Sequence, residues 1–520
     1  MDNVVSEAQD TMINQLNFGL PETSQYITDR RFVNYFPSTS STYSSQQGNQ
    51  NMRFYISGDS NTYLDLSSIR LFATLQNNEE GAENRAKFLR PLGGLHSFFQ
   101  RYRASVGGQM VQDITEYNRH CETYKSFKSR DVNEMDDIES SANPSWDDNY
   151  HKYANGLDNF MFLNEAGDAI GINAAGDHNE WGKIGFRHTR HSLCGVPGNK
   201  GKMRLGHKPV CGLLESNYYL PLRFAPLELE FTIVSDPNEP IVVPEGDEQT
   251  DPTESDKEGY YFQGGNTSVK WELNNIIIRA EVITLDNTVD NNITKHLLEG
   301  QSLKLIVPQY HTLTQNFNVG GGEINMNIVK SASKLSTAFI TLYRQKRQGE
   351  RYDGKFYVDN YVHKRYNYFY NPMINSEIND GPNAQAVAIQ RGQGFQDYTR
   401  NLSWQLQVSN KKYPEFECQS LSEAFYYLRR TLHYMNGDQN SLNISYSQYR
   451  SNKFIIGMSF EKMQDTSFTG TNTKQGSLIV FKIKATEGVL AEAEQIQEVF
   501  IHMISEAVLE LTESGSIVYD

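Results

Sequence analysis

One stretch of the chain decides its fold class: LDLSSIRLFATL, residues 64–75. Leu64 and Leu66 are apolar at even positions, whereas Ile69, Leu71, Ala73 and Leu75 form an apolar set at odd positions. A β-strand has a period of two residues, so each half of the stretch predicts a half-buried strand. The change of parity at residues 67–68 predicts a bulge or a bend between the two strands.

The same pattern returns later in the chain as WELNNIIIRAEV, residues 271–282. Both stretches have two apolar positions, a polar pair, a change of parity and four further apolar positions. We interpret them as an internal repeat with one copy in each half of the chain. The two halves also close alike, because residues 227–233 alternate cleanly and residues 509–511 do so after the apolar run 499–504.

The composition changes along the chain indicate an arm, two β domains and a linker. The segment that we interpret as a linker contains PEGDEQTDPTESDKE, with seven acidic residues and almost no apolar ones, which is typical of a solvated connection. The predicted parts are the N-terminal arm 1–50, the first domain 51–235, the linker 236–267 and the second domain 268–520, which contains a long loop at 345–415.

Two capping boxes predict one amphipathic helix in each half. Asp113–Glu116 is followed by a stripe at the spacing of a helix, and Ser420–Glu423 is followed by another that ends at Asn436-Gly437. The two stripes are Ile114, Tyr117, Cys121, Tyr124, Phe127 and Leu421, Ala424, Phe425, Leu428, Leu432. Few helices among many short strands favour β-sandwiches with a helix packed beside each.

Composition and charge exclude several classes of protein. The chain has 520 residues, of which 38% are hydrophobic and 12% aromatic, and its net charge is −15. This acidity disfavours a wholesale nucleic-acid coat, and no run reaches the ~20 apolar residues that span a bilayer. The acidic N-terminus predicts no secretory signal peptide. Four scattered cysteines without a CxxC motif indicate no disulfide framework and suit a reducing compartment.

One group of residues has the chemistry of metal ligands: His188, His191, Cys194, His207 and Cys211. Zinc takes four nitrogen or sulfur ligands, and short pairs can share one ion. The spacing of these residues does not match that of a zinc-binding module, so we favour a histidine-bearing loop with two ordinary thiols. We therefore expect no metal and no cofactor.

The sequence offers no group of residues that we would assign to catalysis. The carboxylate pairs Asp136-Asp137 and Asp147-Asp148 lie in polar stretches, whereas acid–base work needs burial and convergence. Basic clusters at 101–103, 125–130 and 344–351 are mixed with aromatic residues, as on a nucleic-acid surface. For them we favour a solvated face or a set of salt bridges between subunits.

At this point the sequence shows a resemblance. PLGGLHSFFQRYRASVGGQMVQDITEY, residues 91–117, resembles the first-barrel signature of the double jelly-roll major capsid proteins of virophages, polinton-like viruses and adintoviruses. Residues 106–110 match a small hairpin of that signature. YFPSTSS at 35–41, YLPLRFAPLELEF at 219–231 and residues 271–285, read as the opening of the second barrel, are also similar to that family.

The resemblance implies a mainly β fold: two tandem eight-stranded antiparallel jelly-roll sandwiches, with a few short helices in the connecting loops. It implies a major capsid protein that forms homotrimers, which tile an icosahedral virus shell as pseudo-hexagonal capsomers without catalysis. The implied partners are neighbouring capsomers, penton and minor capsid proteins, and an inner membrane or the genome on the inner face, with no small-molecule substrate. The implied location is the virion, assembled inside the host cell.

Within such a trimer, we expect the Tyr-rich loop 357–373 and the basic stretch 344–351 to form contacts between subunits. Two other hypotheses stay open. A minor virion protein or glycan-binding β-sandwich would use exposed aromatic residues, and a glycoside hydrolase on this scaffold would need two convergent carboxylates ~5–10 Å apart. The sequence offers no such carboxylate pair, and the duplicated strand pattern argues against a single-barrel penton protein.

Overall fold

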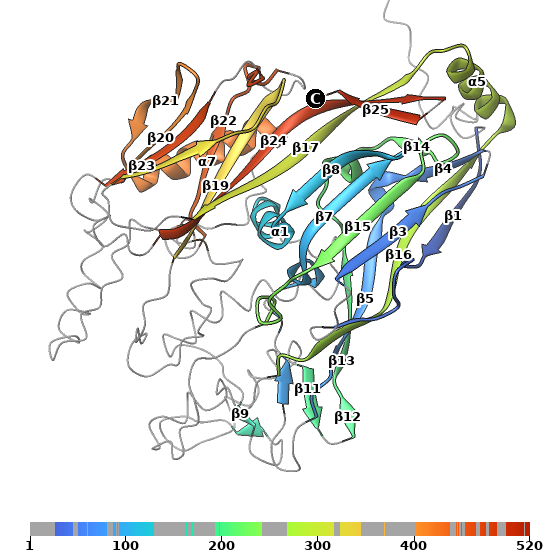
Figure 1. Ribbon diagram of the computed structural model, residues 1–520, viewed down its shortest axis with the longest axis horizontal. Coiled ribbons are helices and arrows are strands. Elements are labelled where there is room, and N and C mark those ends of the chain that lie inside the picture. The colour runs from blue at the N-terminus through green and yellow to red at the C-terminus, as the bar shows by residue number, and fades with distance from the viewer. Residues whose placement is uncertain are drawn as a thin grey trace, which may run out of the picture.

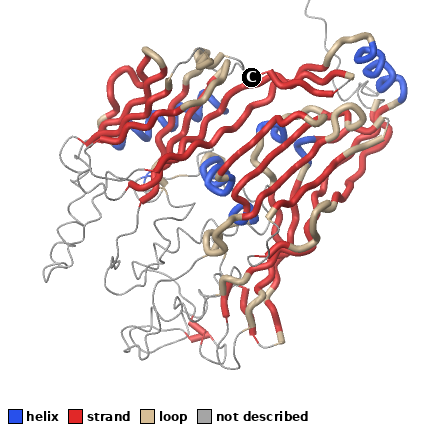
Figure 2. Tube along the Cα trace, in the orientation of Figure 1, coloured by secondary structure: helices blue, strands red, loops and turns tan. Residues whose placement is uncertain are grey.

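The structure of the protein is a computed structural model. It describes residues 26–44, 50–59, 61–80, 87–89, 91, 93–128, 162–163, 169–170, 193–196, 198–241, 268–316, 323–344, 369, 402–436, 444, 446, 449, 453–463, 469–474, 478–485, 496–513 and 515–519. Strands dominate these segments, and they form two antiparallel β-sandwiches that lie side by side (Figure 1, Figure 2).

The first sandwich contains a four-stranded sheet in the order β3-β15-β7-β8. Its strands are β3 (Asn51–Ile56), β15 (Leu227–Ile233), β7 (Phe99–Val106) and β8 (Gln109–Thr115). Residues of β3 alternate strictly between exposed and buried, as expected for a sheet that covers a core on one face. Phe54 and Phe231 meet inside with their ring centroids 6.3 Å apart. β3 and β15, the first and last strands of this sheet along the chain, are neighbours, as in a Greek key.

The opposing sheet of the first sandwich has seven strands, and β16 runs through its middle. One edge of β16 pairs with β5 and β4, and the other edge pairs with β1 and β2. The strands are β1 (Ile27–Tyr35), β2 (Tyr43–Ser44), β4 (Thr62–Asp65), β5 (Arg70–Asn77), β13 (Lys202–His207), β14 (Tyr219–Pro221) and β16 (Trp271–Leu285).

The two stretches that we interpreted as an internal repeat are partners in this sheet. Leu273 of β16 lies opposite Leu75 of β5, and Ile278 lies opposite Leu71. The register shifts between Asn274 and Ile277, and the short turn η3 (Leu66–Ser68) separates β4 from β5. The predicted bulge and bend are therefore confirmed, but the interpretation as a repeat is wrong. The patterns match because neighbouring strands bury the same face and change direction together.

This pairing also corrects where two segments belong. Residues 271–285 were assigned to the opening of the second barrel, but they complete a sheet of the first sandwich. Residues 27–35, assigned to the arm 1–50, form the strand β1 on the far edge of β16. The physical reason is that alternate residues of β16, such as Ile278 and Ala280, are buried in the core of the first sandwich. The acidic segment 236–267 is described only as far as Ile241.

The second sandwich has two sheets in the orders β17-β24-β19-β22 and β18-β23-β20-β21, with β25 added beside β24. These are eight strands with the neighbour order of a jelly roll, plus one C-terminal strand. The strands are β17 (Leu303–Asn316), β18 (Glu323–Ile328), β19 (Leu335–Arg344), β20 (Leu402–Val408), β21 (Lys411–Cys418), β22 (Ile455–Ser459), β23 (Ile479–Ala485), β24 (Ile496–Thr512) and β25 (Gly515–Tyr519).

Three α-helices accompany the strands in the described segments: α1 (Tyr117–Lys125), α5 (Asn287–Leu298) and α7 (Leu421–Asn436). The second predicted capping box is confirmed, because Ser420 Oγ accepts from the Glu423 amide at 3.2 Å. The first is wrong: Asp113 lies in β8, and α1 begins after Glu116, whose side chain makes no capping bond. The helix α5 was not predicted.

The remaining elements are short. They are β6 (Lys87–Leu89), β9 (Phe162–Leu163), β10 (Ala169–Ile170), β11 (Leu193–Val196), β12 (Asn199–Lys200), η4 (Leu95–Phe98) and η5 (Gly212–Glu215). Among the described residues, no helix has both the length and the apolar character needed to cross a bilayer.

Candidate functional site: the junction between the two sandwiches

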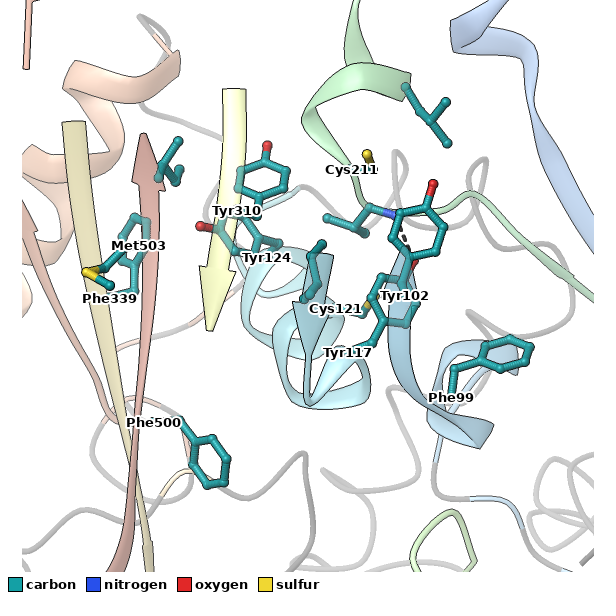
Figure 3. Packing of buried hydrophobic residues seen from close by; sticks show 14 of the residues in the cluster. Phe99, Tyr102, Tyr117, Cys121, Tyr124, Cys211, Tyr310, Phe339, Phe500 and Met503 are labelled. Carbon is teal, nitrogen blue, oxygen red and sulfur yellow. Dashed lines mark hydrogen bonds between the residues drawn. The ribbon is translucent and has the colours of Figure 1, made fainter. Parts of the chain in front are cut away.

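The helix α1 lies between the two sandwiches, with side chains directed at both (Figure 3). On one side, Tyr117 stacks on Tyr102 of β7, with their ring centroids 5.2 Å apart. On the other side, Tyr124 meets Tyr310 of β17 at 4.9 Å, and Phe127, just after the helix, meets Phe339 of β19 at 4.5 Å. The predicted stripe of α1 is thus buried, but it joins two domains rather than covering one.

The sheet edges that face each other at the junction are bridged by side chains. The Gln112 side chain of β8 accepts from the Tyr310 amide at 3.0 Å and donates to the Tyr310 carbonyl. Gln309 donates to the Val111 carbonyl at 3.0 Å, and Thr115 donates to the Thr312 carbonyl at 3.0 Å. Both β8 and β17 are outer strands of their own sheet paths. The junction therefore covers edges that would otherwise offer open backbone groups.

The turn η5 holds the backbones in very close contact. A Cβ atom added at Gly212 would lie 2.0 Å from the carbonyl oxygen of Pro308 in β17. Beside it, the Tyr310 hydroxyl donates to Glu215 at 2.8 Å. Only glycine leaves room for this approach, so the two sandwiches are packed against each other along η5 and β17.

Buried charges cross the junction as well. Arg119 of α1 is paired with Glu116 at 2.9 Å and with Glu239 at 2.6 Å. Its guanidinium lies over the ring of Phe500 in β24, 4.9 Å from the centroid, where cation–π attraction adds to the ion pairs. The Arg119 charge is therefore satisfied by the first sandwich and covered by the second.

A second ion pair, between Glu122 of α1 and Lys453, joins the two sandwiches. The Lys453 Nζ lies 2.8 Å from Glu122 Oε1, and their side chains are only 12% and 14% exposed. Burial alone would raise the pKa of Glu122, but Lys453 and His96 outweigh it and hold that pKa well below its usual range. Glu122 is therefore ionised at neutral pH and balances a lysine from the other sandwich.

The metal-ligand hypothesis receives no support from the residues that the structure places. His207 is buried in β13, and its Nε2 lies 2.9 Å from the Tyr117 hydroxyl. Burial raises the pKa of the Cys211 thiol to about 11, which keeps it protonated. Cys194 lies in β11, whereas His188 and His191 lie outside the described residues. Within the described segments, no group of three or more His, Cys, Asp or Glu side chains could hold a metal ion.

The basic clusters are largely paired inside the chain. Arg101 is paired with Asp113 and Arg103 with Glu230, in a charge ladder across the outer face of β8, β7 and β15. Lys128 pairs with Glu215 at 3.4 Å. Arg101 and Arg103 thus lie on a partly solvated face, as one of the two interpretations expects, and their ion pairs lie within the chain rather than between subunits. The cluster 344–351 beyond Arg344 and both carboxylate pairs lie outside the described residues.

Of the Tyr-rich loop 357–373, only Phe369 is described. It is fully buried, and the Lys453 ammonium lies 5.1 Å from its ring centroid. Phe369 also meets Tyr343 of β19, with ring centroids 6.2 Å apart. This residue of the loop therefore packs within its own chain.

The junction itself was not predicted from the sequence. Buried polar residues of α1, among them Asn118, His120 and Thr123, break the amphipathic pattern that predicts a helix lying on one sheet. The one sequence signal was this excess of polar residues around an apolar stripe, and it gave no indication of the second sandwich.

Comparison with known proteins gives a match in structure only. No protein-family model matches the sequence, and no curated protein matches it. The crystal structure of PBCV-1 VP54, fitted into a cryo-EM reconstruction of the virophage Sputnik, matches with a TM-score of 0.51 and 10% identity, covering 94% of this chain and 96% of that chain.

Two further structures are similar over nearly the whole chain. A chain in the cryo-EM structure of the Sputnik virophage has a TM-score of 0.50 and 9% identity, covering 98% of this chain and 92% of that one. The Faustovirus major capsid protein has a TM-score of 0.50 and 8% identity, covering 98% and 94%. These similarities establish the double jelly-roll fold for this chain.

Proposed function

We propose that this chain is a major capsid protein that acts by self-assembly rather than by catalysis. The observation that carries the proposal is the buried junction, which fixes two jelly rolls of one chain side by side. Three such chains around an axis present six similar sandwiches, so a homotrimer makes a pseudo-hexagonal tile. The extensive fold similarity to a protein named as a major capsid protein supports the same function.

The proposal places several parts of the chain in the trimer and in the shell. The loop 345–415 forms a tower on the trimer, and the Tyr-rich loop 357–373 and the basic stretch 344–351 contact neighbouring subunits. Tiles then pack edge to edge into an icosahedral shell in the virion, with penton and minor capsid proteins at its vertices and joints. The net charge of −15 suits a solvated outer surface.

The first test is the mass of the purified chain in solution, measured by light scattering and mass photometry at low and high salt. A homotrimer of 59.4 kDa subunits has a mass of about 178 kDa, and negative-stain images would show pseudo-hexagonal particles or sheets when the protein is concentrated. A chain that stays monomeric at every concentration would contradict the proposal and favour a glycan-binding sandwich.

The role of the Tyr-rich loop has a separate test. Replacing Tyr366, Tyr368 and Tyr370 together by alanine should shift the trimer towards monomers, because aromatic side chains contribute much of the binding energy of interfaces. A matched control replaces three tyrosines of the first sandwich that are at least half exposed, Tyr26, Tyr55 and Tyr218. An unchanged trimer in the first variant would remove the loop from the interface.

A further inference from the structure

The centre of the junction holds a histidine in an unusual position. His120 of α1 is 0% exposed, and neither ring nitrogen has a hydrogen-bond partner among the described residues. Buried polar groups in proteins are nearly always hydrogen-bonded, so such a side chain calls for a physical explanation. A neutral imidazole can be tolerated here as an aromatic ring, whereas an imidazolium would need two acceptors for its two N–H groups.

The groups around His120 come from both sandwiches. Its ring lies 4.5 Å from the ring of Tyr124 on α1, 5.1 Å from Tyr310 on β17 and 5.9 Å from His502 on β24, measured between centroids. The stacked ring of Tyr117 lies 6.3 Å away. His120 is thus packed among aromatic rings at the place where the first sandwich meets the second.

A second buried histidine, His502, belongs to the same cluster, and the half-buried His311 follows Tyr310 on the other face of β17. His502 is 0% exposed; its Nδ1 lies 3.2 Å from the Thr312 hydroxyl and its Nε2 3.4 Å from the Thr123 hydroxyl. His311 of β17 contacts the Ser505 hydroxyl at 2.9 Å. Hydroxyl groups can serve either tautomer of a neutral imidazole, but they provide no negative charge to balance a proton.

The carboxylates of the neighbouring elements are already engaged. Glu116 and Glu239 pair with Arg119, Glu215 accepts from Tyr310, and Glu122 pairs with Lys453. The remaining titratable groups that face the cluster are the buried Tyr117, Cys121, Tyr124 and Tyr310, which are neutral, and Arg119, which is positive. Asp113 and Lys330 act on His311 with opposite signs. A proton added to His120 or His502 would therefore gain no counterion and would meet positive neighbours.

The titration behaviour of the cluster agrees with this geometry. Burial, followed by the charges of His502 and His311, lowers the pKa of His120 well below its ordinary value of 6.5. Burial lowers the pKa of His311 and of His502 to about 3, with Lys330 and Arg119 adding to the effect. In the closed junction, all three histidines are neutral at neutral pH.

We propose that His120 and His502 form an acid-sensitive latch between the two jelly rolls: the junction stays closed while the two imidazoles are neutral and opens when they take up protons. Opening hydrates the cluster without breaking the cores of the sandwiches, which extend beyond the junction to pairs such as Leu75 and Leu273 in the first and Tyr413 and Phe460 in the second. This inference does not depend on the proposed capsid function.

The direction of the pH effect follows from linkage. In the open state the histidines bind protons near 6.5, whereas in the closed state they bind them only at much lower pH. The junction is therefore fully stable above pH ~6.5 and loses stability as the pH falls below it. At pH ~5.5 each histidine that becomes solvated should favour the open state by about tenfold.

The test uses hydrogen–deuterium exchange of the full-length protein at pH ~7.5 and ~5.5, corrected for the intrinsic pH dependence of exchange. Protection of α1 and β17 should fall by at least tenfold at the lower pH, while protection of β3 and β15 persists. The variant His120→Phe keeps an aromatic ring and should weaken this pH dependence by about tenfold. His296→Phe, at an exposed position on α5, is the matched control and should behave as wild type.

Equal loss of protection in wild type and His120→Phe would overturn the proposal, as would simultaneous loss in α1 and in β3. A second measurement covers the case in which the variant does not fold. Exchange of the imidazole C2 hydrogens in the wild-type protein, followed by mass spectrometry, reports the titration midpoint of each histidine. A midpoint for His120 well below that of His296 supports the latch, and a midpoint equal to it would disprove the latch.

Discussion

The two jelly rolls use the same strand order with different chain connections. One sheet of each sandwich has an early strand paired with a late strand, which pairs in turn with a middle strand: β3-β15-β7 in the first sandwich and β17-β24-β19 in the second. The fourth strand of this sheet is β8 in the first sandwich and β22 in the second, and the two are reached by different connections. β8 follows β7 directly through Gly107 and Gly108, both with positive φ, whereas β22 arrives only after β20, β21 and α7.

This difference changes the role of the helix in each sandwich. The helix α7 presents Leu421, Ala424 and Leu428 to its own domain and leaves the intervening positions mostly exposed. The helix α1 follows the local hairpin β7–β8 and is buried along most of its length, because the second sandwich covers it. One helix completes a domain, and the other joins two domains.

The largest effect is expected for Gly212→Ala. The new Cβ would lie 2.0 Å from the Pro308 carbonyl oxygen, so the backbones of η5 and β17 must separate, at a cost of about 3 kcal/mol or more. We expect denaturant unfolding to split into two transitions, one for each sandwich. Gly470→Ala, with a Cβ 2.4 Å from the Leu335 carbonyl oxygen inside the second sandwich, should lower only that sandwich's transition. An unchanged single transition in Gly212→Ala would contradict a tight junction.

The ion pair across the junction should follow. Lys453→Met leaves Glu122 buried without its lysine, which should cost about 3 kcal/mol of unfolding free energy. The control Lys295→Met removes a lysine of α5 whose side chain is 75% exposed, and it should change the stability by less than about 0.5 kcal/mol. Adding Glu122→Gln to Lys453→Met should restore part of the loss; a double variant as unstable as the sum of both single variants would show that the pair is uncoupled.

The ion pair between Glu122 and Lys453 also predicts that the stability of the junction depends on pH. The pKa of Glu122 is lowered in the folded chain, so its stabilisation is present above its usual value of 4.5 and is lost as the pH falls below that value. Denaturation midpoints measured from pH ~6 to ~3 should fall less steeply in Lys453→Met/Glu122→Gln than in wild type. Parallel curves for the two proteins would rule out a lowered pKa of Glu122.

The smallest effect concerns the two capping boxes. Ser420→Ala removes the acceptor for the Glu423 amide and should destabilise α7 by about 1 kcal/mol, seen as faster amide exchange in its first turn. Asp113→Asn should leave exchange in α1 unchanged, because Asp113 pairs with Arg101 on the sheet surface and such pairs contribute about 0–1 kcal/mol. Faster exchange at the start of α1 in Asp113→Asn would mean that Asp113 caps the helix after all.

Features set by neighbouring residues were the ones that the sequence could predict. The bulge at Asn274, the bend at Ser67 and the cap at Ser420 each depend on a few adjacent positions, and all three are present. The hairpin at Gly107-Gly108, which the family resemblance implied, is also present, and its two glycines have the positive φ angles of a tight turn. The fold class also followed, since period-two burial and few helices allow little else.

Features that depend on a distant partner were predicted poorly. The alternation of β16 fits a core strand of either sandwich, so nothing in residues 271–285 reveals that they pair with β5 and β4. The box at Asp113 carries the right residues for a cap, but pairing with β7 extends β8 through Thr115 and uses them as a strand.

The residue pattern alone is enough to predict a mainly β protein with two sandwiches and an amphipathic helix in the second half. Three features became visible only in the folded chain: the sandwich to which β16 belongs, the burial of α1 on both sides, and the meeting of His120, His502 and Arg119 at one junction. The physical reason is that burial pattern is a local property of a strand or helix, whereas the choice of partner depends on packing between surfaces hundreds of residues apart in sequence.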